Sequence, residues 1–247
     1  LGNPNLKSAS STNYNLGFIY QFKATTLSLD LWEIDYENRI EVESAQAILS
    51  SNPNGPSVTR NEFGDLIGVS TTYFNEENTF ISGIDFQFEY LMEISKGDLS
   101  INIMGTSLTD FLTPNLNSPN KMINRIGKFN FDNHVHSLPK KRINSFINLS
   151  YKNFVLGFST RYIDGYKNER EITGLGLTYG YQNTVKSFLV HDISLKASKG
   201  NLSYSIYLSN LLDKSAPRLY DAPDFSFDTR VHDPRGRILG LNIGYEF

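Results

Sequence analysis

The four histidines are the residues of this sequence that are best suited to bind a metal ion. His134 and His136 stand two residues apart in the stretch DNHVHS, and alternate residues of a strand share one face. Metal sites usually need three or four ligands, however, and His191 and His232 lie far away in the sequence with no carboxylates spaced to support them. The chain has no cysteine, so thiolate zinc sites and disulfide frameworks are excluded. We therefore expect no metal and no cofactor.

Hydrolytic chemistry is the second possibility, because His191 is followed directly by Asp192 in the stretch VHDIS. Adjacent residues of a strand point to opposite faces, so these two side chains cannot form a catalytic dyad. His191 is instead in phase with Leu189 and Ile193, as expected for a residue at a boundary between apolar and aqueous surroundings. The sequence thus gives no support for an enzyme.

The composition favours β structure. Of 247 residues, 14 are Tyr, 17 are Phe and 1 is Trp, and the mean hydropathy is still negative at -0.33. A net charge of -3 gives no broad basic surface, which argues against nucleic acid as a partner. The sequence predicts no transmembrane helix, and its start, LGNPNLKSAS, lacks the basic and apolar regions of a signal peptide. Two alternatives remain: the chain is cytoplasmic, or it is a mature or truncated piece of an exported protein.

Apolar side chains recur at every second position along most of the chain, which is the period of a strand with one apolar face. The clearest case is TFISGIDFQFEYLMEI (79–94), in which aromatic and polar residues alternate. The segment 25–40 changes phase between Leu31 and Trp32, which either a β-bulge or a change of surroundings would explain. The nine predicted strands are about 11–21, 25–40, 79–94, 98–110, 140–151, 154–164, 185–197, 201–212 and 235–247.

The connections between these predicted strands fall into two kinds that strictly alternate. Four are tiny and contain hairpin-turn residues, whereas the other four are long and polar. In an up-and-down meander every second connection lies at the same end of the sheet. The short connections are therefore expected at one end and the long connections at the other. The short connections are QFKA (21–24), SKGD (95–98), YKNF (151–154) and SKGN (198–201), and the long ones are about 41–78, 111–139, 165–184 and 213–234.

This form is typical of transmembrane β-barrels, which have short periplasmic turns, longer extracellular loops, an apolar outer face and a polar lumen. A soluble β-sandwich also alternates apolar and polar residues. The predicted strands run to about 11–16 residues, beyond the usual soluble length of about 5–6 but close to the roughly 9–11 of a tilted membrane strand. We therefore expect an all-β, antiparallel up-and-down transmembrane β-barrel, with outer-membrane lipid against its apolar face.

The number of predicted strands is odd, whereas bacterial single-chain barrels have an even number. An odd number also places the two ends of the chain at opposite ends of the sheet. We therefore expect residues 1–247 to be the C-terminal portion of a larger barrel domain whose earlier strands are absent here.

Five stretches, which span essentially the whole chain, carry a family resemblance. The first, GNPNLKSASSTNYNLGF (2–18), contains a Gly-Asn-Pro-x-Leu-Lys segment before a Tyr-x-Leu-Gly strand, although Ser8 and Ala9 replace the usual Pro and Glu. The others are LSLDLWEIDYENRI (27–40), ISGIDFQFEY (81–90) with Gly83 and Asp85, LSNLLDKSAPRLYD (208–221) and HDPRGRILGLNIGYEF (232–247). In this order along the chain they resemble the TonB-dependent outer-membrane receptors.

The resemblance implies a barrel of roughly 22 strands with a plugged lumen, of which this chain supplies about nine. It also implies an active transporter in the outer membrane of a Gram-negative bacterium, which takes up a scarce ligand such as a siderophore, a vitamin or an oligosaccharide. These residues contain no TonB box and no plug domain, so contact with the TonB complex is expected through the absent N-terminal part. The alternatives are a passive porin-like channel and, less favoured, an outer-membrane barrel enzyme.

The last strand is a candidate assembly signal. Its alternating apolar residues resemble the signal that the barrel assembly machinery reads in this family. They also fit a lipid-facing strand with an aromatic girdle at its end. The residues are Leu239, Leu241, Ile243, Tyr245 and Phe247.

The lumen and the long loops hold the candidate ligand contacts. Polar side chains in the inward phase contact either a substrate or, alternatively, the plug and neighbouring strands. Aromatic loop residues either contact a ligand or pack loop against loop. The predicted lumen residues are Asp85, Gln87, Glu89, Arg142, Asn144 and Arg161, and the aromatic loop residues are Tyr73, Phe74, Tyr179 and Tyr181.

Overall fold

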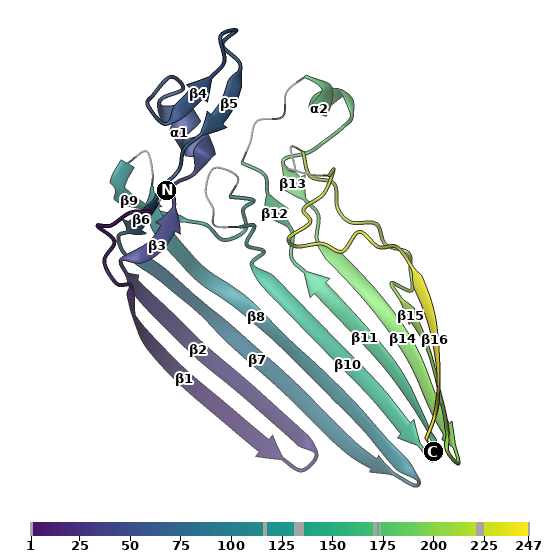
Figure 1. Cartoon of the computed structure of the whole chain (residues 1–247). Helices are drawn as coiled ribbons and strands as arrows, with labels where there is room; N and C mark the ends of the chain where they lie inside the picture. Colours follow the sequence, from purple (N-terminus) through teal and green to yellow (C-terminus); the bar gives the residue numbers. More distant parts are fainter. Residues whose placement is uncertain are drawn as a thin grey trace.

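One large antiparallel sheet forms most of the computed structural model, and nine of its strands follow one another in chain order (Figure 1). The structure describes residues 2–115, 118–130, 136–169, 172, 174–220 and 225–246. Within these residues the sheet is open, with β1 and β16 at its edges. The strands are, in order, β1 (Ser10–Phe22), β2 (Thr25–Glu37), β7 (Thr79–Ile94), β8 (Gly97–Asn115), β10 (Lys141–Tyr151), β11 (Phe154–Ile163), β14 (Phe188–Lys199), β15 (Leu202–Ser209) and β16 (Ile238–Tyr245), and β9 (Ser118–Asn124) pairs with the end of β8.

Each of the nine predicted strands is confirmed as a strand of this sheet, and the boundaries differ where the backbone turns. β2 ends at Glu37 rather than at residue 40, because Asn38 adopts a left-handed conformation with φ 54°. β15 ends at Ser209 for the same reason, since Asn210 has φ 51°. β8 instead continues beyond its predicted end, as far as Asn115.

The long connections contain short strands and helices that the sequence analysis did not predict. The short strands pair locally, β3 with β6, β4 with β5 and β12 with β13, and they lie at one end of the large sheet (Figure 1). No helix of the described residues is long and apolar enough to cross a membrane. The elements are β3 (Arg39–Val42), α1 (Ala45–Ser51), β4 (Val58–Arg60), β5 (Leu66–Val69), β6 (Tyr73–Glu76), β12 (Tyr166–Lys167), α2 (Leu175–Thr178) and β13 (Thr184–Val185).

The short connections are confirmed as tight turns, and they lie at the opposite end of the sheet from the long loops (Figure 1). They join β1 to β2, β7 to β8, β10 to β11 and β14 to β15. Lys23, Lys152 and Gly200 have φ angles of 51°, 53° and 57°, the left-handed conformation that tight hairpins need. The two ends of the chain therefore lie at opposite ends of the sheet, as the odd number of strands predicts (Figure 1).

The pairing register places the predicted apolar residues on one face from edge to edge of the sheet. Leu29, for example, lies opposite Phe18 on one side and opposite Phe86 on the other. At the two edges, Leu16 is 69% exposed and Leu241 is 66% exposed. No second sheet covers this apolar face in the part of the chain that the structure describes. The β-sandwich alternative is therefore wrong.

The phase change in β2 is not caused by a bulge. The pairing of β2 with β1 and with β7 is continuous from Leu31 to Trp32, so Leu31 lies on the apolar face and Trp32 on the polar face. The bulge in this region belongs to β8, where the register shifts opposite Ser82 and Gly83. A change of surroundings along β2 is therefore the explanation that stands.

Three glycines of the sheet lie directly opposite aromatic rings. Each ring crosses its glycine so closely that an added Cβ would meet ring carbons well inside van der Waals contact. The missing side chain thus makes the space in which the neighbouring ring lies. The pairs and the distances from the added Cβ to the nearest ring carbon are Gly83 with Trp32 (2.5 Å), Gly105 with Phe86 (2.7 Å) and Gly240 with Tyr207 (2.0 Å).

We predict that Gly83→Ala destabilises the fold by about 1–3 kcal/mol, because the new methyl group displaces the Trp32 ring. Urea denaturation of the full-length protein in detergent micelles, followed by tryptophan fluorescence, measures the loss. The control is Gly68→Ala in β5, where the added Cβ meets no atom within 4 Å. Equal stability of the two variants would contradict the packing role of Gly83.

Candidate functional site

The predicted lumen residues of β7, β10 and β11 share the polar face of the sheet. Asp85 and Arg142 both lie opposite Thr106, one on each side of β8, and Asn144 lies opposite Arg161. The Thr106 hydroxyl donates a hydrogen bond of 2.6 Å to Oδ1 of Asp85. The register therefore gathers these polar side chains on one wall.

Nearer the short turns, Gln87 and Glu89 form a polar cluster with Asn102. Nε2 of Gln87 donates to Oε1 of Glu89 at 2.7 Å, and Nδ2 of Asn102 donates to the same oxygen at 3.0 Å. The bond between Asn102 and Glu89 joins side chains of the neighbouring strands β8 and β7, which was the alternative to substrate contact. The predicted face of both residues is confirmed, whereas their contact with a substrate stays a prediction.

The two ends of the last loop, at Asn210 and at residues 233–236, line a cavity of about 350 Å³ together with the polar face of β11, β14 and β15. On the wall, Nη2 of Arg161 lies 3.4 Å from Oδ2 of Asp192, and the backbone N–H at the start of the loop donates to Asp192 Oδ1 at 2.8 Å. On the loop, Arg235 donates hydrogen bonds to Asp233 and lowers the pKa of that carboxyl to about 2. Paired charges of both signs therefore line this cavity.

The long loops before β10, β14 and β16 pack against one another through a small hydrophobic core, which we call the loop core. Val185 and Leu219 are 0% and 1% exposed, and they pack with Phe129 and Tyr166. Val231 packs against this cluster from the last loop. The buried apolar side chains of the described chain thus gather largely in the loops and not on the faces of the sheet.

Asp228 ties the same three loops together. The Tyr166 hydroxyl donates to Asp228 Oδ2 at 2.9 Å, and the Ser137 hydroxyl donates to the same oxygen. Burial, together with the charge of Asp228, raises the pKa of Tyr166 far above its usual value. Tyr166 therefore stays protonated and keeps its proton directed at the carboxylate.

His232 fills the space beside this carboxylate. Its ring stacks on Tyr166 with a centroid distance of 6.0 Å, and Phe188 meets it edge-on at 5.3 Å. Burial lowers the pKa of His232, because the imidazolium loses its water; the Asp228 charge opposes this effect and Arg142 adds to it. His232 is therefore a neutral packing residue beside the loop core.

The other histidines are not part of the cluster around His232. His191 is on the apolar face, where its Nδ1 lies 2.9 Å from Oγ1 of Thr160, whereas Asp192 is on the polar face. The two residues therefore point away from each other, as the sequence analysis predicted. His136 is exposed on a loop, and His134 lies outside the described residues. The described residues contain no group of three potential metal ligands.

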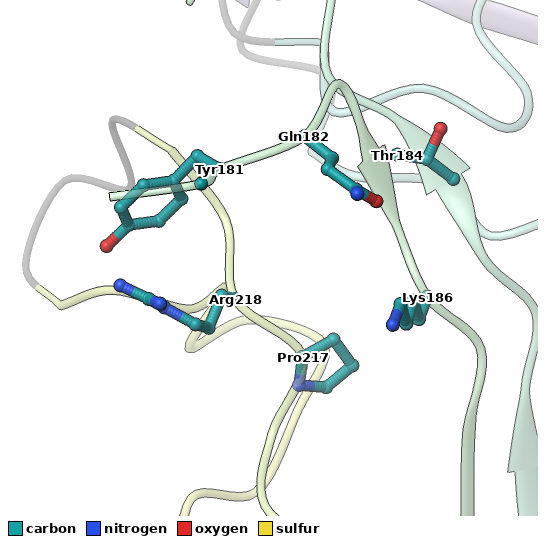
Figure 2. A pocket seen from close by; sticks show the side chains of 7 residues that line it. Tyr181, Gln182, Thr184, Lys186, Pro217 and Arg218 are labelled. Atoms are coloured by element: carbon teal, nitrogen blue, oxygen red, sulfur yellow. The ribbon is translucent and has the colours of Figure 1, made fainter. Parts of the chain in front are cut away.

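The predicted aromatic loop residues belong to two separate loops. Tyr73 and Phe74 are in β6, whereas Tyr179 and Tyr181 precede β13. Tyr179 is 62% exposed, but Tyr181 is partly buried against Arg218, whose guanidinium carbon lies 4.4 Å from the centre of its ring. Tyr181 and Arg218 line a second cavity, of about 210 Å³ (Figure 2).

The sequence analysis missed Arg218 and Asp228, and no local pattern marks either residue. Asp228 stands 91 positions from Ser137 and 62 from Tyr166 in the chain. Asp192 was considered only as a partner of His191. Its phase on β14, opposite Ser159 of the polar face, is the signal that assigns it to the wall.

The terminal strand β16 presents its predicted residues on the apolar face, opposite the apolar residues of β15. Phe247 lies outside the described residues. The assembly role of these residues stays a prediction. Their exposed fractions are 68% for Leu239, 66% for Leu241, 64% for Ile243 and 57% for Tyr245.

Comparison with known proteins gives a match to one family model. The model, described as "TonB dependent receptor-like, beta-barrel", matches residues 1–211. The search of curated proteins found no match.

Several solved structures have a similar fold. A mutant of the ferric enterobactin receptor PfeA from Pseudomonas aeruginosa is 15% identical, with a TM-score of 0.62, over 99% of this chain and 32% of that chain. The siderophore receptor PirA from Pseudomonas aeruginosa is 16% identical, with a TM-score of 0.55, over 100% and 31%. The FrpB iron transporter from Neisseria meningitidis is 12% identical, with a TM-score of 0.58, over 98% and 32%. At these identities the likeness is one of fold, and the chain spans about a third of the length of each.

We predict that Asp228→Ala loosens the three loops by about 2–5 kcal/mol, because it leaves the buried hydroxyls of Ser137 and Tyr166 without their acceptor. Hydrogen exchange of the full-length protein in detergent micelles measures the loss at the amides around both residues. The control, Asp233→Ala, removes an exposed ion pair with Arg235 in the same loop and should leave this exchange unchanged. Equal exchange rates in the two variants would show that Asp228 does not hold the loops.

Proposed function

Because the chain belongs to the TonB-dependent receptor β-barrel family, we propose that it is part of an outer-membrane transporter that takes up a scarce ligand into a Gram-negative cell. The observation that carries this proposal is the apolar face that runs across all nine strands, with a polar face behind it. Hydrocarbon is the solvent that such a face requires. The long loops then lie outside the cell, and the tight turns lie in the periplasm.

The proposal concerns a whole protein, and the chain spans about a third of the length of the similar receptors. We assign residues 1–247 to the C-terminal portion of its barrel domain. The plug and the contact with the TonB complex belong to other parts of that protein. The polar face described above is then the wall against which a plug lies, and its charged residues are available to hold it.

Ligand contact is assigned to the polar wall and to the loops beyond it. Asp85, Arg142 and Arg161 bring charges of both signs to the wall, and Tyr181 brings an aromatic ring to the loops. A siderophore, a vitamin and an oligosaccharide all bind through such combinations of polar and aromatic groups. Receptors of this family take up ligands without making or breaking bonds, so the chain is not an enzyme.

We predict that the full-length protein takes up its ligand only in cells that contain TonB, because a plugged barrel needs work from the inner membrane to open. Uptake of labelled siderophores, vitamin B12 and oligosaccharides is compared in four strains, with and without this protein and with and without TonB. Uptake that requires the protein but continues without TonB would contradict the proposal. That result would favour the porin-like alternative.

Deleting Phe247 from the full-length protein is predicted to lower its folded amount in the outer membrane several-fold, because the proposed signal for the barrel assembly machinery loses its last aromatic residue. Heat-modifiable gel mobility of outer-membrane fractions measures the folded amount. Phe22→Ala is the matched control, since it removes an exposed aromatic residue of β1 beside a tight turn. An unchanged folded yield after the deletion would refute the assembly role.

A further inference from the structure

A row of lysines stands at the end of the sheet that carries the tight turns (Figure 1). Each of the four short connections contains one lysine, and all four lysines are exposed. Backbone hydrogen bonds join neighbouring turns, for example from the N–H of Ser198 to the carbonyl oxygen of Asn153 at 2.9 Å. The row is therefore built into the end of the sheet. Its members are Lys23, Lys96, Lys152 and Lys199.

Lys96 and Lys152 lie directly opposite each other in adjacent turns. The backbone N–H of Lys152 donates to the carbonyl oxygen of Lys96 at 2.8 Å, which continues the register of the preceding pair, Gly97 with Tyr151. Like charges in directly opposite positions repel each other and destabilise a sheet. An anion in contact with both ammonium groups would remove this repulsion.

Two of the ammonium groups lie against the aromatic end of the apolar face. Nζ of Lys152 lies 5.3 Å from the centre of the Tyr151 ring, and Nζ of Lys23 lies 5.2 Å from the centre of the Phe22 ring. Both rings continue the apolar phase of their strands, and Tyr151 packs with Phe154 at a centroid distance of 5.6 Å. The two charges therefore lie where the apolar face ends, with their aliphatic stems beside it.

The acidic residues beside the turn of Lys96 are on the polar face of the sheet. Glu93 and Asp98 lie opposite each other in β7 and β8. Oδ2 of Asp98 accepts a hydrogen bond of 2.9 Å from the hydroxyl of Ser150 in β10. This end of the sheet is therefore negative on its polar face and positive beside its apolar face.

We propose that Lys96 and Lys152 bind the phosphate group of an anionic phospholipid such as phosphatidylglycerol, whose acyl chains lie along the apolar face. The proposal rests on the proposed function, which places the tight turns at the periplasmic surface of the membrane, among phospholipid headgroups. Clusters of basic residues beside a membrane attract anionic lipids in this way. Lys23, beside Phe22, and Lys199, opposite Leu202 of the apolar face, extend the same surface to neighbouring headgroups.

Lipid binding to the full-length protein in detergent micelles tests this site. Native mass spectrometry counts the bound lipids while phosphatidylglycerol, or phosphatidylethanolamine with the same acyl chains, is added. Phosphatidylethanolamine carries the same phosphate, but its own ammonium group neutralises the charge, so the comparison isolates the net charge of the headgroup. The control variant, Lys196→Gln, removes an exposed lysine from the polar face of β14 near the same turns.

We expect the wild type to bind phosphatidylglycerol more tightly than phosphatidylethanolamine. Lys96→Gln and Lys152→Gln should each weaken the binding of phosphatidylglycerol about fivefold, whereas Lys196→Gln should leave it unchanged. Lys152→Arg should keep the affinity, because it keeps the charge. Inorganic phosphate should displace the lipid no better than sodium chloride of equal ionic strength, because it lacks the acyl chains.

Equal affinity of the wild type for the two lipids would overturn the lipid site, and so would equal effects of Lys152→Gln and Lys196→Gln. Specific displacement of the lipid by inorganic phosphate would assign the two lysines to a free anion and would also overturn it. None of these results touches uptake that depends on TonB, so the two proposals fail separately. Uptake that is independent of TonB would, in turn, leave the lipid measurement valid as a property of the turns.

Discussion

The fold depends on the apolar face of the large sheet, which needs a solvent other than water. Leu16 at one edge and Leu241 at the other are both about two-thirds exposed, and the strands between them continue the same face. A ladder of paired strands satisfies its own backbone hydrogen bonds, so hydrocarbon can replace water along it without leaving donors unpaired. The opposite face stays polar because it does not meet that solvent.

Because neither face of the sheet is covered by a second layer of the described chain, the buried apolar core lies mainly in the loops. Val185, Leu219 and Tyr166 are buried at the end of the sheet, and Asp228 joins their loops through two hydroxyl groups. A cavity wall that rests on such a core keeps its geometry although it lies on loops. The candidate ligand contact Tyr181, whose ring stacks on Arg218, lies beside this core.

The sequence predicted the sheet well because alternation has a local cause. Each residue of a strand meets one of two solvents, so the faces of Asp85 and Arg142 follow from phase alone. Tight turns are equally local, since they need residues that tolerate positive φ. The loop core has no such signal: Ser137 meets Asp228 across 91 positions, and only the packing of three loops brings them together.

The phase change in β2 marks where the proposed membrane ends. In the row formed by Tyr14, Glu33 and Ser82 the apolar face becomes polar, while Trp32 and Ile34 bring apolar side chains to the inner face. From that row to the tight turn, β1 runs from Tyr14 to Phe22, close to the roughly 9–11 residues that a tilted strand needs to cross hydrocarbon. Beyond the row, Asp35 and Glu37 continue the outer face of β2, and Ile34 and Tyr36 continue its inner face. The strand therefore changes its alternation without a bulge, because its outer face leaves the proposed hydrocarbon layer at this row.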